Sequence, residues 1–448
     1  MESEQAVPAT VSVIGLGKLG LPMTVCIASG GINVIGADLN QSFVDSVNAG
    51  KAPIYETDLQ EYLDKTSDRI SATTDVGEAV RNSDYSFLIV PTPSMTDGRF
   101  SLDYIEPACR EIGKALREKD DYHLVVITST VMPLDTETRI KPALEEASGK
   151  TCGVDFGLCY SPEFIALGSV IRDFLHPDMI LIGESDEHAG DLLEAFYDTV
   201  CLKEHPTARM SFVNAELSKL SVNTYVTTKI SFANMLARIC EALPGGDIDD
   251  VTGALGMDTR IGKKYLRGAV GYGGPCFPRD NQALIAMADK IGVPAPLAAT
   301  TDQFNRDEVG KLAAIVQAHR TEGTVGILGL SYKPHTDVVE QAVGLKLAQS
   351  LADAGVPVLA YDPAAMENAK ARVSGEVAFA DSAQECVTES SVVVVVTPWP
   401  QFDEVMENPA IGSKTLIDCW RVYENTAFAK SNDYVAVGRS LVREAVGV

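Results

Sequence analysis

The chain has 448 residues, of which 46% are hydrophobic and 22% are charged, and its formal net charge is −25. This length and composition suit a globular protein of about three domains with an ample core. The excess of acidic groups argues against nucleic acid or an anionic membrane surface as a partner, because phosphates would be repelled.

The first predicted element is a strand, Val11 to Ile14, which runs into a turn containing Gly15, Gly17 and Gly20. A helix follows, and a second strand ends at Asp38, 18 positions after the last glycine. This pattern is typical of a dinucleotide-binding β-α-β unit, whose glycines let a pyrophosphate approach the helix N-terminus. The Asp38 carboxylate would bind the ribose hydroxyls, which favours NAD over NADP. The alternative is a glycine-rich turn in an ordinary β-α-β unit.

Three further buried strands are predicted in the first half of the chain. The stretch SDYSFLIVPTP ends at Pro91-Thr92-Pro93, and YHLVVITSTVMP ends at Ser129-Thr130. A third strand, Gly157 to Tyr160, is followed closely by Glu163. Because ligands lie at the carboxyl ends of strands in a doubly wound sheet, these residues are candidates for a binding site.

The middle of the chain is predicted to be helical. From Val213 to Leu243 no Gly or Pro interrupts the sequence, which predicts one long helix of about 45 Å. Lys219 and Asn223 lie four residues apart and therefore on one face, where they could bind an oxyanion; a solvated lysine is the alternative. We expect short helices after Leu243.

A loop with the sequence GYGGPCFPRD, Gly271 to Asp280, lies among these helices. Its three glycines and two prolines exclude a regular helix or strand interior. Cys276 is either a small buried hydrophobe in a tight turn or a nucleophile, and Asp280 lies four residues beyond it.

The last third of the chain repeats the pattern of the first. TVGILGLSYKP resembles VSVIGLGKLG, VPVLAYDP ends on Asp362, and SSVVVVVTP matches SDYSFLIVPTP. The full Gly-x-Gly-x-x-Gly pattern is lost, since Gly326 and Gly329 are followed by Tyr332-Lys333-Pro334, so we expect this copy to bind something other than the pyrophosphate of a dinucleotide. Lys333 and Arg421 are candidate anion contacts, or plain surface charges. The fold class is therefore α/β, with two Rossmann-like doubly wound parallel-sheet domains joined by a helical domain that contains one long helix.

Targeting signals and metal sites are not evident. The start, MESEQAVPAT, has neither a basic nor an apolar signal-peptide region, and no apolar run could span a membrane. The nine cysteines are scattered without a CxxC pair, so we expect reduced thiols and a cytoplasmic location. The six histidines are equally scattered, so no metal site is predicted.

Along nearly its whole length the chain resembles the UDP-glucose/GDP-mannose dehydrogenases. The resemblance rests on GLGKLG, VPTP, STVMP, SPEF, AELSKLSVN, GMDTRIGKKYL, GYGGPCFPRD and SYKP, which occur in the family's order. It implies an NAD-dependent enzyme that oxidises the C6 alcohol of a nucleotide sugar to a carboxylate, through a thiohemiacetal and a thioester on Cys276, and reduces two NAD. UDP-glucose is the expected substrate, and an N-acetylated UDP-hexose or GDP-mannose is the alternative.

The resemblance also assigns residues and an assembly. The thiol of Cys276 would be surrounded by Lys219, Asn223 and Asp280, while Thr130 and Glu163 would position or activate water. The implied NAD contacts are Gly15, Gly17, Leu19, Gly20, Asp38, Pro91, Thr92 and Thr130. The implied contacts to the nucleotide sugar are Glu163, Phe164, Lys219, Asn223, Arg260, Tyr265, Tyr272, Gly273, Lys333 and Arg421. A homodimer built on the long helix, or a higher oligomer, is expected, with three domains at 1–205, 206–305 and 306–448.

Some positions depart from the family pattern. Leu167 replaces a second Glu, Pro275 stands where Ser is common, and Val339-Glu340-Gln341 replaces Arg-Glu-Ser. These changes leave the identity of the sugar and the contact to the cofactor phosphate open. Two other functions remain possible at this point: a two-electron β-hydroxyacid dehydrogenase, which needs no thiol, and an NAD-binding regulator whose thiol senses oxidants.

Overall fold

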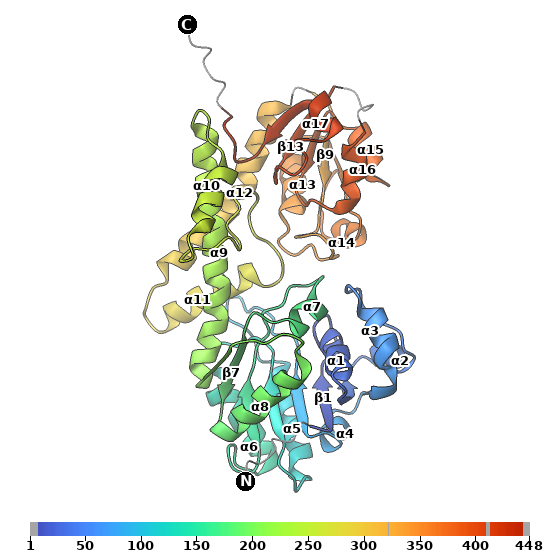
Figure 1. Cartoon of the computed structure of the whole chain (residues 1–448), viewed down its shortest axis with the longest axis vertical. Coiled ribbons are helices and arrows are strands. Elements are labelled where there is room, and N and C mark those ends of the chain that lie inside the picture. The colour runs from blue at the N-terminus through green and yellow to red at the C-terminus, as the bar shows by residue number, and fades with distance from the viewer. Residues whose placement is uncertain (1–7, 321, 409–412, 442–448) are drawn as a thin grey trace. The chain divides into compact units, whose positions relative to one another are not determined.

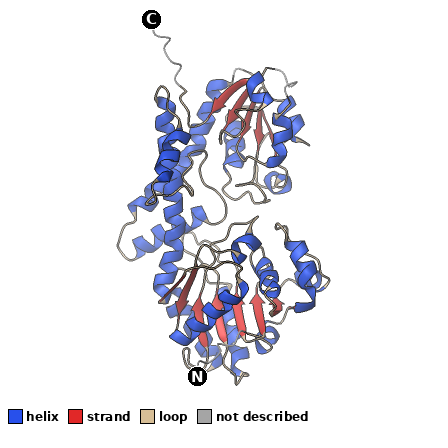
Figure 2. Cartoon of the chain, in the orientation of Figure 1, coloured by secondary structure: helices blue, strands red, loops and turns tan. Residues whose placement is uncertain are grey.

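The computed structural model describes residues 8–320, 322–408 and 413–441. The chain forms two compact units, Met1–Ser221 and Val222–Val448, and the division falls within the 31-residue helix α9 (Phe212–Ala242). Each unit contains a β-sheet with helices beside it (Figures 1 and 2). Among the described residues, no helix is both long enough and apolar enough to cross a membrane.

The first unit is built on an eight-stranded sheet with the order β3-β2-β1-β4-β5-β6-β7-β8. Its strands are β1 (Thr10–Ile14), β2 (Asn33–Ala37), β3 (Ile70–Thr73), β4 (Tyr85–Leu88), β5 (Leu124–Ile127), β6 (Gly157–Tyr160), β7 (Ile180–Glu184) and β8 (Thr207–Met210). Its helices before α9 are α1 (Gly20–Ser29), α2 (Gln41–Asn48), α3 (Leu59–Thr66), η1 (Ser67–Arg69), α4 (Val76–Arg81), α5 (Ile105–Arg117), η2 (Thr136–Ile140), α6 (Lys141–Ser148), α7 (Val170–Leu175) and α8 (Glu187–Val200).

The direction of the last two strands differs from the predicted parallel sheet. The first six strands are parallel, but β7 runs antiparallel to β6, with Tyr160 opposite Gly183, and β8 is parallel to β7. The connection from β6 to β7 therefore does not cross over as in a β-α-β unit, although α7 lies within it. The sheet is doubly wound over its first six strands only.

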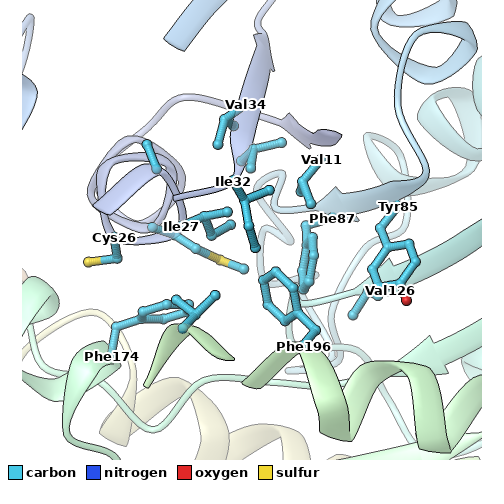
Figure 3. Close-up of a cluster of buried hydrophobic side chains, with 14 of the residues drawn as sticks. Val11, Cys26, Ile27, Ile32, Val34, Tyr85, Phe87, Val126, Phe174 and Phe196 are labelled. Carbon is cyan, nitrogen blue, oxygen red and sulfur yellow. The ribbon is translucent and has the colours of Figure 1, made fainter. Parts of the chain in front are cut away.

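Both faces of this sheet are covered, because successive side chains of each strand point to opposite faces. Val11, Phe87 and Val126 pack on one face with α1 and α8, as Figure 3 shows. Ile14 and Leu88 pack on the other face with α5 and α6. Burial on both faces explains why these strands read as continuous apolar runs, and it leaves the strand ends and their loops for binding.

The second unit begins with helices and continues as a sheet. Its helical part contains the remainder of α9, α10 (Ile248–Met257), α11 (Phe277–Lys290) and α12 (Pro296–His319). The expectation of short helices is wrong for α12, which has 24 residues. The predicted boundary at 305/306 falls inside α12, and the one at 205/206 falls just before β8, which pairs in the first sheet.

The C-terminal sheet has six parallel strands in the order β11-β10-β9-β12-β13-β14. Its strands are β9 (Val325–Leu328), β10 (Val358–Tyr361), β11 (Val377–Phe379), β12 (Val392–Val395), β13 (Thr415–Asp418) and β14 (Asp433–Ala436). Its helices are α13 (Val343–Asp353), α14 (Met366–Lys370), α15 (Ala383–Thr388), η3 (Pro400–Phe402), α16 (Asp403–Met406) and α17 (Ala427–Ser431). This order repeats that of β3-β2-β1-β4-β5-β6, so the predicted repetition of the first domain by the last is confirmed.

Candidate functional site

The glycine-rich turn after β1 has the geometry of a dinucleotide site. Gly15 has φ +102°, and a Cβ there would collide with the carbonyl oxygen of Ile89. A Cβ at Gly20, the first residue of α1, would collide with the carbonyl oxygen of Gly15. At Gly17, in contrast, no atom lies within 4 Å of the Cβ position. The first and third glycines therefore make the turn, and the second leaves open space beside the helix N-terminus, as a pyrophosphate requires.

Asp38 lies where β2 ends and contacts this turn. Its Oδ2 accepts a hydrogen bond of 2.8 Å from the backbone N–H of Leu16, and its Oδ1 accepts one from Asn40. The remaining acceptor capacity of the carboxylate can bind ribose hydroxyls, so the residues present fit NAD. Leu19 is the N-cap residue of α1.

The loops after β4 and β5 are joined by Ser129. Its hydroxyl donates to the carbonyl oxygen of Val90 at 2.7 Å and accepts from the N–H of Val90 at 2.9 Å. This places Pro91 and Thr92 in a loop tied to the loop of Thr130, which is half-buried. Both strands end earlier than predicted, at Leu88 and Ile127, so these residues lie in loops beyond the strand ends.

Glu163 lies in the loop after β6 beside Lys219 of α9. The Lys219 ammonium donates to the carbonyl oxygen of Glu163 at 2.6 Å and lies 4.6 Å from the centre of the Phe164 ring. Burial raises the pKa of the Glu163 carboxyl to about 7, and the Tyr197 hydroxyl and the Lys219 charge oppose that rise. A carboxyl with a pKa near 7 can accept and release a proton at neutral pH, as a general base must.

Glu216, a buried carboxylate of α9, supports the segment that follows Thr130 and was not predicted. Its two oxygens accept hydrogen bonds from the backbone N–H groups of Leu134 (2.6 Å) and Thr136 (2.8 Å). Leu134 has φ +82°, an uncommon value for a non-glycine residue. Glu216 thus connects α9, three residues before Lys219, to the segment that follows Thr130.

In the second unit, Cys276 is the N-cap residue of α11 and its side chain is exposed. The positive end of the helix dipole stabilises an anion at this position, which favours a thiolate. The other eight cysteines are buried or half-buried free thiols. Exposure and position therefore distinguish Cys276 as the thiol available for reaction.

Asp280 lies one turn further along α11 and is buried. Its Oδ2 accepts a hydrogen bond of 2.5 Å from the side-chain amide of Asn223, which lies on α9 one turn after Lys219. The next residue, Asn281, is bonded to Thr227 of α9 and to the hydroxyl of Tyr272. The start of α11 is therefore anchored to α9 by two adjacent polar side chains.

The loop that precedes Cys276 is anchored by Asn305 of α12. The Asn305 amide donates to the carbonyl oxygen of Tyr272 at 2.9 Å and accepts from its N–H at 2.7 Å. Tyr272 is 5% exposed, so its ring supports the loop. Tyr265 is half exposed, with φ +61°, and its ring lies edge-on to Phe277.

The same loop contacts the modified turn of the C-terminal sheet. Gly329 (φ +96°) and Gly344 repeat the contact between Gly15 and Gly20, but they lie fifteen positions apart in sequence instead of five. The segment between Gly329 and Gly344, residues 330–343, is therefore ten residues longer than its counterpart, and this inserted segment contains Lys333. Glu340 accepts a hydrogen bond of 2.8 Å from the N–H of Gly274 through its carbonyl oxygen.

The carboxylate of Asp362 occupies the position in this second turn that Asp38 has in the first. It is 1% exposed, and its Oδ2 accepts hydrogen bonds from the N–H groups of Leu330 and Ser331, the hydroxyl of Ser331 and the indole N–H of Trp399. Its Oδ1 accepts from the N–H groups of Ala364 and Ala365. Six donors leave no capacity for a ribose, so this turn lacks the ribose contact that Asp38 can provide in the first turn.

Two predicted arginine contacts differ in their surroundings. The Arg421 side chain is fully buried and makes two bonds, of 2.7 and 2.8 Å, to the Asp249 carboxylate and two more to the carbonyl oxygens of Val437 and Arg267. In this structure it joins α10 to the C-terminal sheet. The Arg260 side chain is 87% exposed and is bonded to the Asp258 carboxylate on one side, so its outer face is available to a ligand.

The predicted residues thus form two sets. Glu163, Phe164 and Lys219 lie together in the first unit, and Asn223, Cys276 and Asp280 lie together in the second. No group of three or more metal-ligating side chains occurs within residues 8–320, 322–408 and 413–441.

The Rossmann turn with its open central glycine, and the thiol at a helix N-terminus, define a dinucleotide-dependent oxidoreductase. Three models of the UDP-glucose/GDP-mannose dehydrogenase family match the chain: the NAD-binding domain at residues 9–201, the central domain at 213–307 and the UDP-binding domain at 326–425. The chain belongs to the UDP-glucose/GDP-mannose dehydrogenase family.

Individual relatives agree with this assignment. The chain is 36% identical to the UDP-glucose 6-dehydrogenase AglM of Haloferax volcanii, over 92% of this chain and 96% of that protein. It is also 36% identical to a GDP-mannose 6-dehydrogenase of Pseudomonas aeruginosa, over 79% and 80%. The solved structure of a UDP-glucose dehydrogenase from Pyrobaculum islandicum is 33% identical and superposes with a TM-score of 0.87, covering 98% of this chain and all of that one.

Proposed function

We propose that the chain oxidises the C6 alcohol of UDP-glucose to the carboxylate of UDP-glucuronate, with two NAD reduced per sugar. The observation that supports this most is the exposed thiol of Cys276 at the start of α11, with buried Asp280 one turn further on. A two-electron alcohol dehydrogenase has no use for such a thiol, whereas oxidation of an aldehyde to an acid through a thioester requires one.

When bound, NAD accepts one hydride in each of the two oxidations. In the first, a water molecule held by Asp280 and Lys219 takes the proton of the C6 hydroxyl, and the ammonium of Lys219 stabilises the oxygen as its negative charge develops. Asn223 keeps the Asp280 carboxylate in place through its 2.5 Å hydrogen bond.

Cys276 acts in the second oxidation. Its thiolate adds to the aldehyde carbon, so that a C–S bond forms, and the carbonyl oxygen takes back a proton from the water held by Asp280 and Lys219 to give a thiohemiacetal. Loss of that proton and of the C6 hydride converts it into a thioester. The helix N-terminus favours the thiolate before attack and again when it leaves.

Hydrolysis completes the cycle and is assigned to Glu163. Its carboxylate takes a proton from water while the water oxygen adds to the thioester carbon, and the C–S bond then breaks to return the Cys276 thiolate and release the acid. Thr130 positions this water. The pKa of Glu163, raised to about 7 by burial, suits it to this proton transfer.

We assign recognition of the nucleotide to the second unit. Lys333, in the segment inserted into the second Rossmann turn, and the exposed Arg260 are the proposed anion contacts. Arg421 is proposed only as a residue that supports this region, because its donors are taken by Asp249 and by backbone carbonyls.

We further propose a homodimer, in which Arg260 reaches the sugar nucleotide of the partner. Within the second unit, the apolar side chains of Tyr225, Phe232 and Ile239 repeat every seven residues along α9 and are 64%, 46% and 48% exposed. A stripe with this spacing fits a facing helix. The nine free thiols support a reducing, cytoplasmic location.

The experiment that tests the reaction is a count of NADH per acid formed, with NAD and a panel containing UDP-glucose, an N-acetylated UDP-hexose and GDP-mannose. Two NADH per acid with UDP-glucose preferred is the expected result. A preference for another sugar would change the substrate only. One NADH per substrate, or none, would contradict the four-electron reaction and favour the β-hydroxyacid dehydrogenase or the redox regulator.

A further inference from the structure

The carboxyl group of Glu163 has a buried tyrosine as its side-chain hydrogen-bond partner. The hydroxyl of Tyr197, on α8, lies 3.2 Å from Glu163 Oε1, and Ser161 Oγ lies 3.0 Å from the same hydroxyl. Tyr197 and Ser161 are each 1% exposed. No motif of the sequence identifies Tyr197, because it lies on a helix 34 residues after Glu163.

The direction of the hydrogen bonds among Ser161, Tyr197 and Glu163 follows from which of these groups carries a proton. Burial keeps the pKa of Tyr197 well above its usual value, so its hydroxyl retains a proton. An ionised carboxylate only accepts, so Tyr197 donates its one proton to Glu163, and the Ser161 hydroxyl must donate to Tyr197. When Glu163 is protonated the order reverses: Glu163 donates to Tyr197, and Tyr197 donates to Ser161.

The tyrosine is also held rigidly. Its ring packs edge-on to the ring of Phe196, with 5.4 Å between the ring centres, and its centre lies 6.3 Å from that of Phe174. All three residues belong to the core cluster in which Figure 3 labels Phe174 and Phe196. A hydroxyl fixed in this way cannot follow a carboxylate that moves, so the position of Tyr197 determines the position of Glu163.

From this geometry we propose that Tyr197, together with Ser161, is the positioning residue for Glu163 and keeps its carboxyl group hydrogen-bonded in both of its protonation states. The proposal rests on the role assigned above to Glu163 in thioester hydrolysis. It adds that this step depends on a hydroxyl that touches neither the sugar nor NAD.

The other groups that face Glu163 do not duplicate this role. Lys219 of α9 binds the backbone carbonyl of Glu163 and lowers the pKa of its carboxyl through its charge. The thiols of Cys26, on α1, and Cys201, after α8, are close enough to interact electrostatically, but burial raises the pKa of both, so they stay neutral. Within the first unit, Tyr197 is therefore the neighbour that donates to the carboxylate.

The test is the pH dependence of turnover in Tyr197→Phe, which removes one oxygen atom and keeps the ring. The Tyr197 hydrogen bond lowers the pKa of Glu163, so its loss raises that pKa and moves the acid limb of the pH–rate profile to higher pH. We expect turnover near pH 6 to fall about tenfold, as for the loss of a hydrogen bond to a charged group, with a smaller fall near pH 9. The fraction of Cys276 that carries the sugar nucleotide, measured by mass spectrometry after quenching, should rise at low pH.

Two comparisons make the test specific. Tyr85→Phe removes a hydroxyl from a buried tyrosine of the same core cluster, and its pH profile should match that of the wild type. Thermal unfolding of both variants reports any general loss of stability. Glu163→Gln should accumulate the thioester at every pH, and adding Tyr197→Phe to it should cause no further loss.

The outcomes separate the two proposals. If Glu163→Gln hydrolyses the thioester normally, the role of Glu163 is wrong and Tyr197 has nothing to position. If Glu163→Gln accumulates the thioester while Tyr197→Phe keeps the wild-type pH profile, the role of Glu163 stands and the inference about Tyr197 is overturned.

Discussion

The Cys276 thiol is exposed at the start of α11, while the carboxylate one turn beyond it is buried and bonded to Asn223. In the proposed mechanism, the carboxylate serves the oxidation of the alcohol and the thiol serves the oxidation of the aldehyde, so a change of the thiol should affect the second oxidation more than the first. Replacing Cys276 with Ser should still permit some oxidation of the alcohol but should stall the aldehyde step, because a serine hydroxyl is far less acidic than a thiol. Cys276→Ala should form no covalent adduct, and NAD binding at residues 15–20 should stay intact.

The measurement is the yield of acid and NADH, with mass spectrometry of the peptide that contains Cys276. The wild type should carry the mass of the sugar nucleotide and make two NADH per acid. Full production of acid by Cys276→Ala would mean that the cysteine only packs in its loop and that the glycines merely let the sugar approach.

Cofactor preference is also set at one residue. Asp38 should favour NAD, because its carboxylate repels a 2′-phosphate. Asp38→Asn keeps an oxygen that can accept from Leu16 N–H but loses the charge, so the ratio of kcat/KM for NAD to that for NADP should fall at least about tenfold, or ~1.4 kcal/mol. Comparable kcat/KM for both cofactors in the wild type would show that Asp38 only stabilises the turn.

Residues in local motifs could be predicted from the sequence, and their partners could not. The turn of Gly15 to Gly20, the thiol loop and the spacing of Lys219 and Asn223 are covalently local patterns. Tyr197 reaches Glu163, and Asn305 reaches the thiol loop, only through tertiary packing, so the sequence contains no signal for them. Glu216 lies in the motif AELSKLSVN, but its partners Leu134 and Thr136 are 82 and 80 residues away in the chain. Arg421 illustrates the converse: the sequence indicates a free cation near a strand end, but the fold places Asp249, 172 residues away in the chain, against it.

Among the elements, the loop that carries the thiol depends on one left-handed glycine. Gly274 has φ +85°, and a Cβ there would lie 2.7 Å from the ring of Tyr332. Gly274→Ala should cost about 1–2 kcal/mol for the backbone conformation alone and should also displace the loop from Glu340. We therefore expect a lower melting temperature and slower alkylation of Cys276, together with a loss of turnover.

Gly245→Ala provides the control, since Gly245 has φ +73° but no atom lies within 4 Å of its Cβ position. It should lose similar stability and keep wild-type alkylation and turnover. Equal turnover in the two variants would show that the contact with the inserted segment does not position the thiol.

The helices and strands that were predicted correctly are those whose own residues show a strong hydrophobic or glycine pattern. The predicted long helix, Val213 to Leu243, matches α9 within one residue at each end. The reversed direction of β7 and β8 was missed because strand direction depends on pairing, which local patterns do not record. The length of α12 was missed because its sequence has Gly310 near the middle and polar residues on several faces.

For the whole molecule, the proposed dimer makes a direct prediction. Light scattering at micromolar concentration should give twice the 47.9 kDa mass of one chain. Phe232→Glu places a charge in the exposed stripe of α9 and should shift the mass toward that of the monomer, because burying an unpaired charge is costly. Leu202→Glu, at a side chain that is 69% exposed and lies outside α9, should leave the mass unchanged. A monomeric wild type would remove the proposal.

The six donors around Asp362 have a consequence for stoichiometry. The six strands of the second sheet repeat the order of the first six strands of the first sheet, but the carboxylate that would bind a ribose there, Asp362, already accepts six hydrogen bonds from the protein. Isothermal titration of the unliganded protein should therefore give one NAD per chain, and the two NAD molecules of each turnover must use that single site in succession. The first NADH therefore has to leave while the aldehyde is still bound to the enzyme. The time that this release takes is the shortest time for which the enzyme must keep the aldehyde from solution. A measured ratio of two NAD per chain would contradict this order of events.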